Sequence, residues 1–126
     1  SPSLHYMNIF RRVRDIIREN VHEDNIWFQA WLNVHSYDNV LDWHNHTAPY
    51  HGYIALEPQD TTTEFENWEV KNDCGNSYFG NGNVRHRVVN NSQYTGRRIT
   101  IGFDVIPESA FEHGRPTKQY GAMPLL

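Results

Sequence analysis

The sequence predicts a mainly β fold: an antiparallel jelly roll, also called a double-stranded β-helix, with an amphipathic helix at its N-terminal side. Apolar residues recur at helical spacing only near the start of the chain. From residue 26 onward, short alternating or apolar segments are separated by turn-forming residues. Many short strands joined by regular turns are typical of sandwiches and jelly rolls.

The helix is expected over residues 7–20 and is expected to pack on the β core. Ile9, Val13 and Ile17 recur on one face of this segment, with arginines between them. This pattern is typical of a surface helix that buries a single face. Asn20 is a residue type that often ends a helix.

The β core is expected over residues 26–106 of a single domain that spans residues 1–126. Ile26–His35 alternates between two environments, as a strand does. Further strands are expected at 40–46, 52–56, 63–70, 77–79, 86–90 and 98–105. The large aromatic residues expected in the core rather than in a pocket wall are Trp31, Trp43, Trp68 and Phe79. An irregular tail is expected over residues 107–126, which contain three prolines.

Composition limits the functional classes. Hydrophobic residues make up 38% and charged residues 21% of the 126 residues, too apolar for a disordered chain. The net charge of −4 does not favour nucleic acid as a partner, and no apolar run is long enough for a membrane span. The single Cys74 excludes an internal disulfide. We therefore expect a cytoplasmic protein that acts on a small molecule or a peptide.

Histidine is the most unusual residue of the composition, with 8 in the chain. His44 and His46 are two positions apart, and on a strand this spacing places both imidazoles on one face, within reach of one metal ion. His86 would supply a third ligand, because a jelly roll brings distant strands face to face. The alternative for each is an incidental or hydrogen-bonded strand histidine.

The strand at 98–105 presents a polar face that needs an explanation. Alternation places Arg98, Thr100 and Gly102 on one side and apolar residues on the other. An arginine that faces the interior is costly unless it meets an anion. A guanidinium beside a hydroxyl group suits a carboxylate, which it can bind in a bidentate manner.

These residues together resemble the C-terminal half of Fe(II)- and 2-oxoglutarate-dependent oxygenases, which are double-stranded β-helices. A histidine, an arginine twelve residues later and a hydroxyl residue two positions beyond carry this resemblance. The upstream motifs resemble the small oxygenases of phage and marine bacterial genomes: Trp31-Leu32-Asn33-Val34, His44-Asn45-His46 and Gly52-Tyr53-Ile54. The similarity covers roughly residues 26–106.

The resemblance implies a dioxygenase that couples decarboxylation of 2-oxoglutarate to hydroxylation of an unidentified substrate. It implies that His44 and His86 bind Fe(II), and that Arg98 and Thr100 hold the C5 carboxylate of 2-oxoglutarate. Tyr53 would add a hydroxyl group to that carboxylate. If the gene belongs to a phage, the protein would act in the host cytoplasm. The chain could also form a homodimer.

His46 stands where these enzymes usually carry an aspartate or glutamate ligand. His46 could bind the metal directly, Asp42 could replace the missing carboxylate, or the site could be degenerate and inactive. We expect direct ligation, which gives a site of three histidines: His44, His46 and His86.

Two other functions compete with an oxygenase. The first is a cupin, a jelly-roll protein with a metal bound by a His-x-His pair and a later histidine. Gly75, His86 and Asn90 follow the spacing of the second cupin motif, but Asn81 and Asn83 stand where that motif has proline and glycine. The chain offers Tyr50 or His51 in place of the cupin glutamate, and His51 could itself be a fourth ligand. The cupin pattern gives no role to Arg98 and Thr100. The second is a binding module of the same fold without catalysis.

Overall fold

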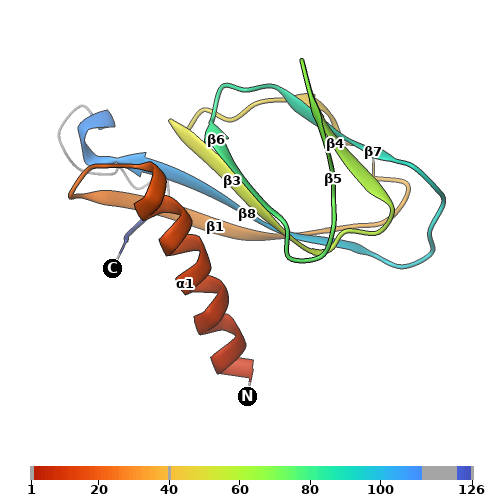
Figure 1. Ribbon diagram of the computed structural model, residues 1–126, viewed down its shortest axis with the longest axis horizontal. Coiled ribbons are helices and arrows are strands. Elements are labelled where there is room, and N and C mark those ends of the chain that lie inside the picture. Colours follow the sequence, from red (N-terminus) through yellow and green to blue (C-terminus); the bar gives the residue numbers. More distant parts are fainter. Residues whose placement is uncertain (1, 40, 112–121, 126) are drawn as a thin grey trace. The chain divides into compact units, whose positions relative to one another are not determined.

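The computed structural model describes residues 2–39, 41–111 and 122–125. Its elements are α1 (Pro2–Asn20), β1 (Ile26–His35), β2 (Leu41–His44), β3 (Tyr50–Glu57), β4 (Thr61–Phe65), β5 (Glu69–Lys71), β6 (Ser77–Asn81), β7 (His86–Asn90), β8 (Arg98–Pro107), the 3-10 turn η1 (Glu108–Ala110) and β9 (Met123–Pro124) (Figure 1). The strands form a five-stranded sheet in the order β6-β3-β8-β1-β9 and a four-stranded sheet in the order β2-β7-β4-β5. The mainly β jelly roll with one N-terminal helix is thereby confirmed.

The chain divides into two compact units, one comprising Ser1–Gln29 and Val105–Leu126 and the other Ala30–Asp104. In the first unit, α1 buries Val13 and Ile17, as the helical period requires. Phe10 contacts Phe28, with 5.9 Å between ring centroids.

The helix begins earlier than expected, at Pro2 instead of residue 7, and ends at Asn20 as expected. Its apolar period begins only at Ile9, and both Leu4 and Met7 are exposed, so no amphipathic signal marks the first turns. Proline is common in the first turn of a helix because its missing N–H needs no partner there.

The tail is not wholly irregular. Residues 108–110 form η1, and β9 pairs with β1 at Trp27 and Phe28. The backbone N–H of Leu125 also donates to the Ile26 carbonyl at 2.8 Å. Residues 112–121 of the expected tail lie outside the described residues.

In the second unit the four-stranded sheet lies opposite strands β6, β3, β8 and β1 (Figure 1). Phe65 of β4 packs on Tyr78 of β6, with 4.7 Å between ring centroids. Gly52 of β3 permits a close approach, because a Cβ atom there would lie 2.6 Å from the Tyr78 carbonyl and would overlap the Phe103 ring.

The strand expected over residues 63–70 is two strands joined by a tight turn. β4 and β5 pair in antiparallel fashion, with Thr63 opposite Val70. The rings of Phe65 and Trp68 stack across the turn, 3.9 Å apart. Because these two aromatic residues flank the turn, the segment has the apolar content of a continuous strand.

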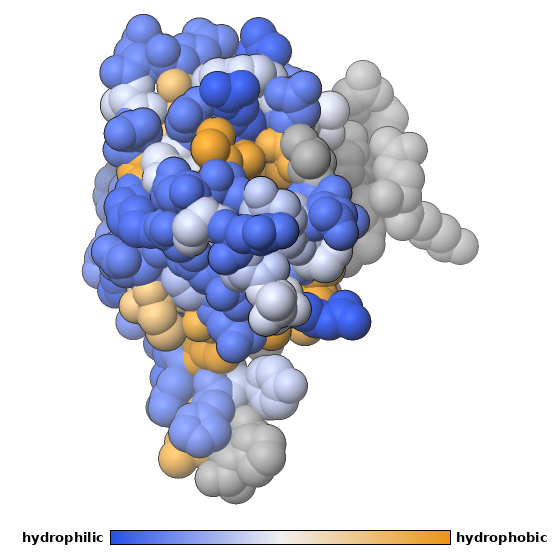
Figure 2. All heavy atoms as spheres, turned by 90° about the vertical axis from the view of Figure 1, so that its right-hand side faces the viewer, coloured by the Kyte–Doolittle hydropathy of each residue, from blue (hydrophilic) through white to orange (hydrophobic). Residues whose placement is uncertain are grey.

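The surface is predominantly hydrophilic on the face that Figure 2 presents, with small hydrophobic areas between polar side chains. Among the described residues, no helix has the length and apolar character needed to cross a membrane.

Candidate metal centre and anion pocket

Strand pairing brings His44 and His86 together. β2 and β7 are antiparallel neighbours, and His44 lies directly opposite His86 in their register. The two imidazole rings meet edge to face, with 4.3 Å between centroids. Antiparallel pairing therefore places two residues distant in sequence side by side.

His46 also lies beside His44 and His86, but it is not positioned by a strand, as was expected. β2 ends at His44, so His46 lies in the following loop and not on a strand. The His46 N–H donates to the Gly82 carbonyl at 2.8 Å, and the Gly82 N–H donates to the Pro49 carbonyl at 2.9 Å. A side chain at residue 82 would overlap the Ala48 carbonyl oxygen, so this anchor requires glycine.

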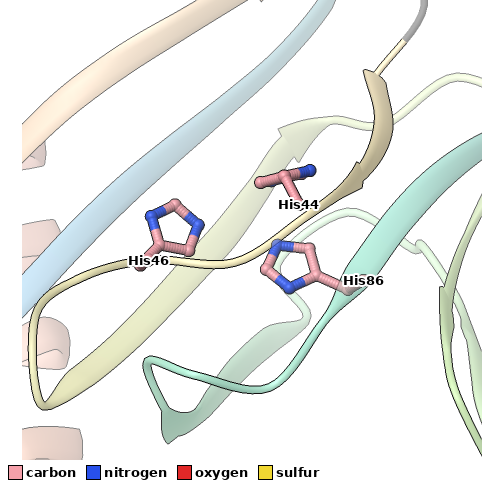
Figure 3. A group of neighbouring side chains, drawn as sticks. All are labelled: His44, His46 and His86. Carbon is pink, nitrogen blue, oxygen red and sulfur yellow. The ribbon is translucent and has the colours of Figure 1, made fainter.

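Figure 3 shows the three imidazoles gathered between the end of β2 and the start of β7. Ligand nitrogens of His44, His46 and His86 lie within 4.8 Å of one another. All three residues are buried or half-buried. The structure thus brings together the three histidines that the sequence predicts as metal ligands.

Hydrogen bonds orient these rings for a metal. His44 Nδ1 lies 2.7 Å from the Asp42 carbonyl, and His86 Nδ1 lies 3.1 Å from the Val84 carbonyl. A carbonyl only accepts, so each Nδ1 carries the proton and each Nε2 keeps its lone pair. His46 Nε2 is buried with no hydrogen-bond partner. Three available imidazole nitrogens fit a transition metal such as iron or zinc.

Asp42 contributes its backbone and not its carboxylate. The Asp42 side chain accepts a hydrogen bond from the Trp43 N–H at 2.7 Å and is exposed. It belongs to neither group of potential ligands found among the described residues. The alternative in which Asp42 replaces the missing carboxylate ligand is therefore not supported.

A buried carboxylate that was not expected from the sequence also lies in this cluster. Asp104, 8% exposed, forms a second potential ligand group with His46 and His51. Asp104 follows Gly102 by two positions, so the alternation that places Arg98, Thr100 and Gly102 inward predicts Asp104 there too.

Burial keeps two of the three candidate ligands neutral. Burial, helped by the neighbouring His51 and opposed by Asp104, lowers the pKa of His46 from 6.5 to about 4. Burial likewise lowers the pKa of His86 from 6.5 to about 4. Because a metal binds only the neutral imidazole, both residues are ready to bind one near neutral pH.

We expect the metal-free protein to lose stability as the pH falls from 6.5 toward about 4. Over this range the unfolded chain takes up protons at His46 and His86 that the folded chain does not, so unfolding is favoured in acid. Urea unfolding at several pH values measures the effect. His86→Phe should remove about one proton from this dependence, and an unchanged slope in that variant would contradict the assignment.

Arg98, Thr100 and Tyr53 line the same cavity as the three histidines. The cavity has a volume of about 270 Å³ and lies between the two sheets of the second unit. Its wall consists of Trp31, Asn33, His35, Leu41, His44, His46, His51, Tyr53, Thr63, Asn72, His86, Val88, Arg98, Thr100 and Gly102. Small-molecule pockets typically begin near this size.

Arg98 is a buried cation held by neutral groups. It is 5% exposed, and one guanidinium nitrogen lies 2.9 Å from His35 Nδ1. The phenol group of Tyr94 also interacts with the guanidinium. Across the part of the chain that the structure describes, no carboxylate forms an ion pair with it. Burial lowers the pKa of Arg98, which means that burial disfavours its charge; an anion in the cavity would offset this cost.

The two hydroxyl residues of the expected carboxylate site differ in their surroundings. Thr100 accepts a hydrogen bond from Asn33 at 3.3 Å, so its own proton remains available to a ligand. The Tyr53 hydroxyl lies 3.1 Å from the Thr63 hydroxyl oxygen and 3.0 Å from the Asn72 side-chain oxygen, and either can accept its one proton. Tyr53 would have to turn away from them to donate to a carboxylate.

The aromatic residues expected in the core occupy different environments. Trp31 lines the cavity and stacks on His51, with 6.0 Å between centroids, so it is a pocket wall. Trp68 is 49% exposed and is not a core residue. Trp43 faces Arg87, whose guanidinium carbon lies 5.0 Å from the ring centroid, and Phe79 stacks on Phe103 as expected.

No family model matches this sequence. No curated protein matches it either. Among solved structures, a cupin superfamily protein from Desulfitobacterium hafniense has 10% identity and a TM-score of 0.51, over 69% of this chain and 83% of that one. A cupin-2 domain protein from Shewanella frigidimarina has 17% identity and a TM-score of 0.46, over 61% and 69%. Hydroxypropylphosphonic acid epoxidase from S. wedmorenis has 14% identity and a TM-score of 0.48, over 61% and 42%.

The likeness to the Desulfitobacterium protein shows the fold. The chain is a double-stranded β-helix of the cupin type, with a histidine cluster that could hold a metal ion inside it.

Proposed function

We propose that the chain is a metal-dependent dioxygenase that uses 2-oxoglutarate as cosubstrate. In this proposal His44, His46 and His86 hold Fe(II), and Arg98 with Thr100 holds the distal carboxylate of 2-oxoglutarate. The observation that carries the proposal is the buried Arg98, which has no acidic partner among the described residues and lines the same cavity as the histidines.

The histidines leave room for a cosubstrate on the metal. Three protein ligands with open positions are typical of non-haem Fe(II) oxygenases. The protonated Nδ1 atoms of His44 and His86 are held by backbone carbonyls, which fixes both rings before a metal arrives. Because Nδ1 of each ring is bonded to a backbone carbonyl, the lone pair on Nε2 remains for the metal.

Arg98 would bind and orient the cosubstrate at its distal end. A guanidinium presents paired N–H donors that match the two oxygens of a carboxylate. The Thr100 hydroxyl adds a donor from the same face of β8, because Asn33 already occupies its acceptor side. The small cavity suits a short dicarboxylate rather than a large cofactor.

Fe(II), when bound, would supply the redox chemistry. 2-Oxoglutarate would be converted to succinate and CO2 with one atom of O2, and the other atom would enter a C–H bond of the substrate as a hydroxyl group. The chain's own residues hold the cosubstrate and limit access of water. His86 and Arg98 are each only 5% exposed, so the reaction would proceed largely shielded from solvent.

Conversion of 2-oxoglutarate without a second substrate tests this function. Protein supplied with Fe(II), ascorbate and O2 should convert 2-oxoglutarate to succinate, measured by NMR, by at least about one turnover per chain because the site itself provides the reaction. Matched samples with Zn(II) in place of Fe(II) should form none. A protein that holds Fe(II) and leaves 2-oxoglutarate unchanged would contradict the proposal.

A metal-binding cupin that does not use 2-oxoglutarate is the second candidate. The observation that favours it is the position of His51 beside the ligands: its ring stacks on His46 with 3.4 Å between centroids and lies 5.7 Å from His86. Such a protein would bind a metal equally well with and without Arg98, and it would not bind 2-oxoglutarate.

A further inference from the structure

A buried carboxylate lies behind the histidine cluster. Asp104 Oδ1 lies 2.9 Å from His51 Nδ1, a hydrogen-bond distance, and 3.8 Å from His46 Nδ1. His51 is 5% exposed, and its ring is parallel to that of His46 within 8°. Asp104 therefore stands against the outer nitrogens of two stacked imidazoles.

The charges of the metal centre show why this position matters. Three neutral histidines leave the whole charge of a divalent ion uncompensated, and Arg98 adds a further positive charge to the same cavity. Asp104 is the acidic member of the potential ligand groups among the described residues. A buried carboxylate at this point would attract the ion through the intervening ring.

The free nitrogen of His46 indicates how Asp104 acts. Its Nδ1 faces Asp104, while its Nε2 is buried without a partner. At 3.8 Å the carboxylate does not accept a hydrogen bond from Nδ1, but its negative charge favours a proton on that nitrogen. The lone pair then stays on Nε2, as it does in His44 and His86, whose Nδ1 protons are bonded to carbonyls. All three rings then present the same nitrogen to a metal.

We propose that Asp104, held in place by a hydrogen bond with His51, is the positioning residue of the metal centre: its charge favours the tautomer of His46 with the proton on Nδ1, and it supplies from behind that ring the negative charge that a carboxylate ligand would supply directly. This inference rests on the metal binding proposed above. It assigns to His51 the role of holding Asp104 and not that of a fourth ligand.

A second metal ion held by His46, His51 and Asp104 is the competing explanation. The 2.9 Å separation of His51 Nδ1 and Asp104 Oδ1 is the ordinary length of an N–H···O hydrogen bond. In addition, His46 has only one Nε2 atom, and that atom is directed to the ion that it shares with His44 and His86. The hydrogen-bonded pair therefore accounts for the geometry with one ion per chain.

The first test compares Co(II) binding by the parent, Asp104→Asn and Asp38→Asn, an exposed control. Asp104→Asn keeps the size and the hydrogen-bond acceptor but removes the charge, so it should weaken binding about 10- to 100-fold, as is typical for partners behind a ligand. The control should match the parent, and binding should saturate at one ion per chain. Asp104→Glu keeps the charge and should bind more tightly than Asp104→Asn.

The second test moves the charge. His46→Asp places a carboxylate directly at the metal, and with Asp104 present two like charges share the site. The double variant His46→Asp/Asp104→Asn should bind Co(II) at least about 10-fold more tightly than Asp104→Asn alone. The effect of His46→Asp should therefore depend on whether Asp104 is present, which is the coupling expected of neighbouring residues. Thermal unfolding of each metal-free variant identifies a loss that comes from misfolding.

The outcomes separate the two proposals. A parent protein that binds no metal overturns the metal function and this inference together. A parent that binds Co(II), with Asp104→Asn equal to it, overturns only the role of Asp104. Two ions per chain, or simply additive effects of His46→Asp and Asp104→Asn, also overturn that role.

Discussion

Replacing His86 with alanine is expected to abolish tight metal binding. His86 lies opposite His44 in the β2–β7 register and has its Nδ1 proton bonded to the Val84 carbonyl, so its Nε2 is directed for ligation. The loss should exceed about 100-fold in the dissociation constant, because a ligand contributes more than the partners behind it. Isothermal titration with Co(II) measures the change.

Two controls support this measurement. His22→Ala removes an exposed histidine far from the cluster in sequence and should bind Co(II) like the parent. His86 is buried, so the unfolding temperature of metal-free His86→Ala shows whether the fold survives the cavity. A folded His86→Ala protein with the parent affinity would exclude His86 as a ligand.

Replacing Arg98 with alanine is expected to abolish binding of 2-oxoglutarate while metal binding stays intact. Arg98 is the buried cation of the cavity, and a bidentate carboxylate would form two charged hydrogen bonds with it. Each is worth about 1.5–3 kcal/mol, so the affinity for 2-oxoglutarate should fall by about 100-fold or more. Titration of the metal-loaded protein with 2-oxoglutarate checks this.

Arg97 offers a matched control on the neighbouring position. It is exposed, and Arg97→Ala should bind 2-oxoglutarate like the parent. Arg98→Lys should restore only part of the affinity, because an ammonium group keeps the charge but cannot form the paired contacts. Equal binding by Arg98→Ala and the parent would rule out Arg98 as the carboxylate anchor.

The sequence predicted the strands best where alternation is clear. Ile26–His35 and His86–Asn90 have the expected bounds. It failed at residues 63–70, where Phe65 and Trp68 stack across a turn that their own apolar character conceals. The first turns of α1 were missed because their apolar side chains are exposed and show no amphipathic period.

For the candidate site, the sequence predicted which residues come together, but not how the backbone brings them together. The spacing of His44 and His46 suggested a shared strand face, whereas His46 is brought in by backbone bonds between its loop and Gly82. Apart from the glycine at residue 82, such backbone bonds leave no signal in the side chains. Asp104, by contrast, was within reach of the same alternation that identified Arg98.

The surroundings of Arg98 show where sequence reasoning stops. Its inward direction follows from alternation along β8, but its contact with His35 joins residues from two strands and depends on the register between them. The bonds of Tyr53 to Thr63 and Asn72 likewise join separate segments. Local sequence patterns predict the face of the strand on which a side chain lies, but not the residues that it contacts.

The most direct test is an anaerobic titration of the Fe(II)-loaded protein with 2-oxoglutarate, followed by visible absorption. We expect a weak charge-transfer band that saturates at one cosubstrate per chain in the parent and does not form in Arg98→Ala. Fe(II) binding with no such band in the parent would contradict a dioxygenase and favour a cupin that binds metal without 2-oxoglutarate.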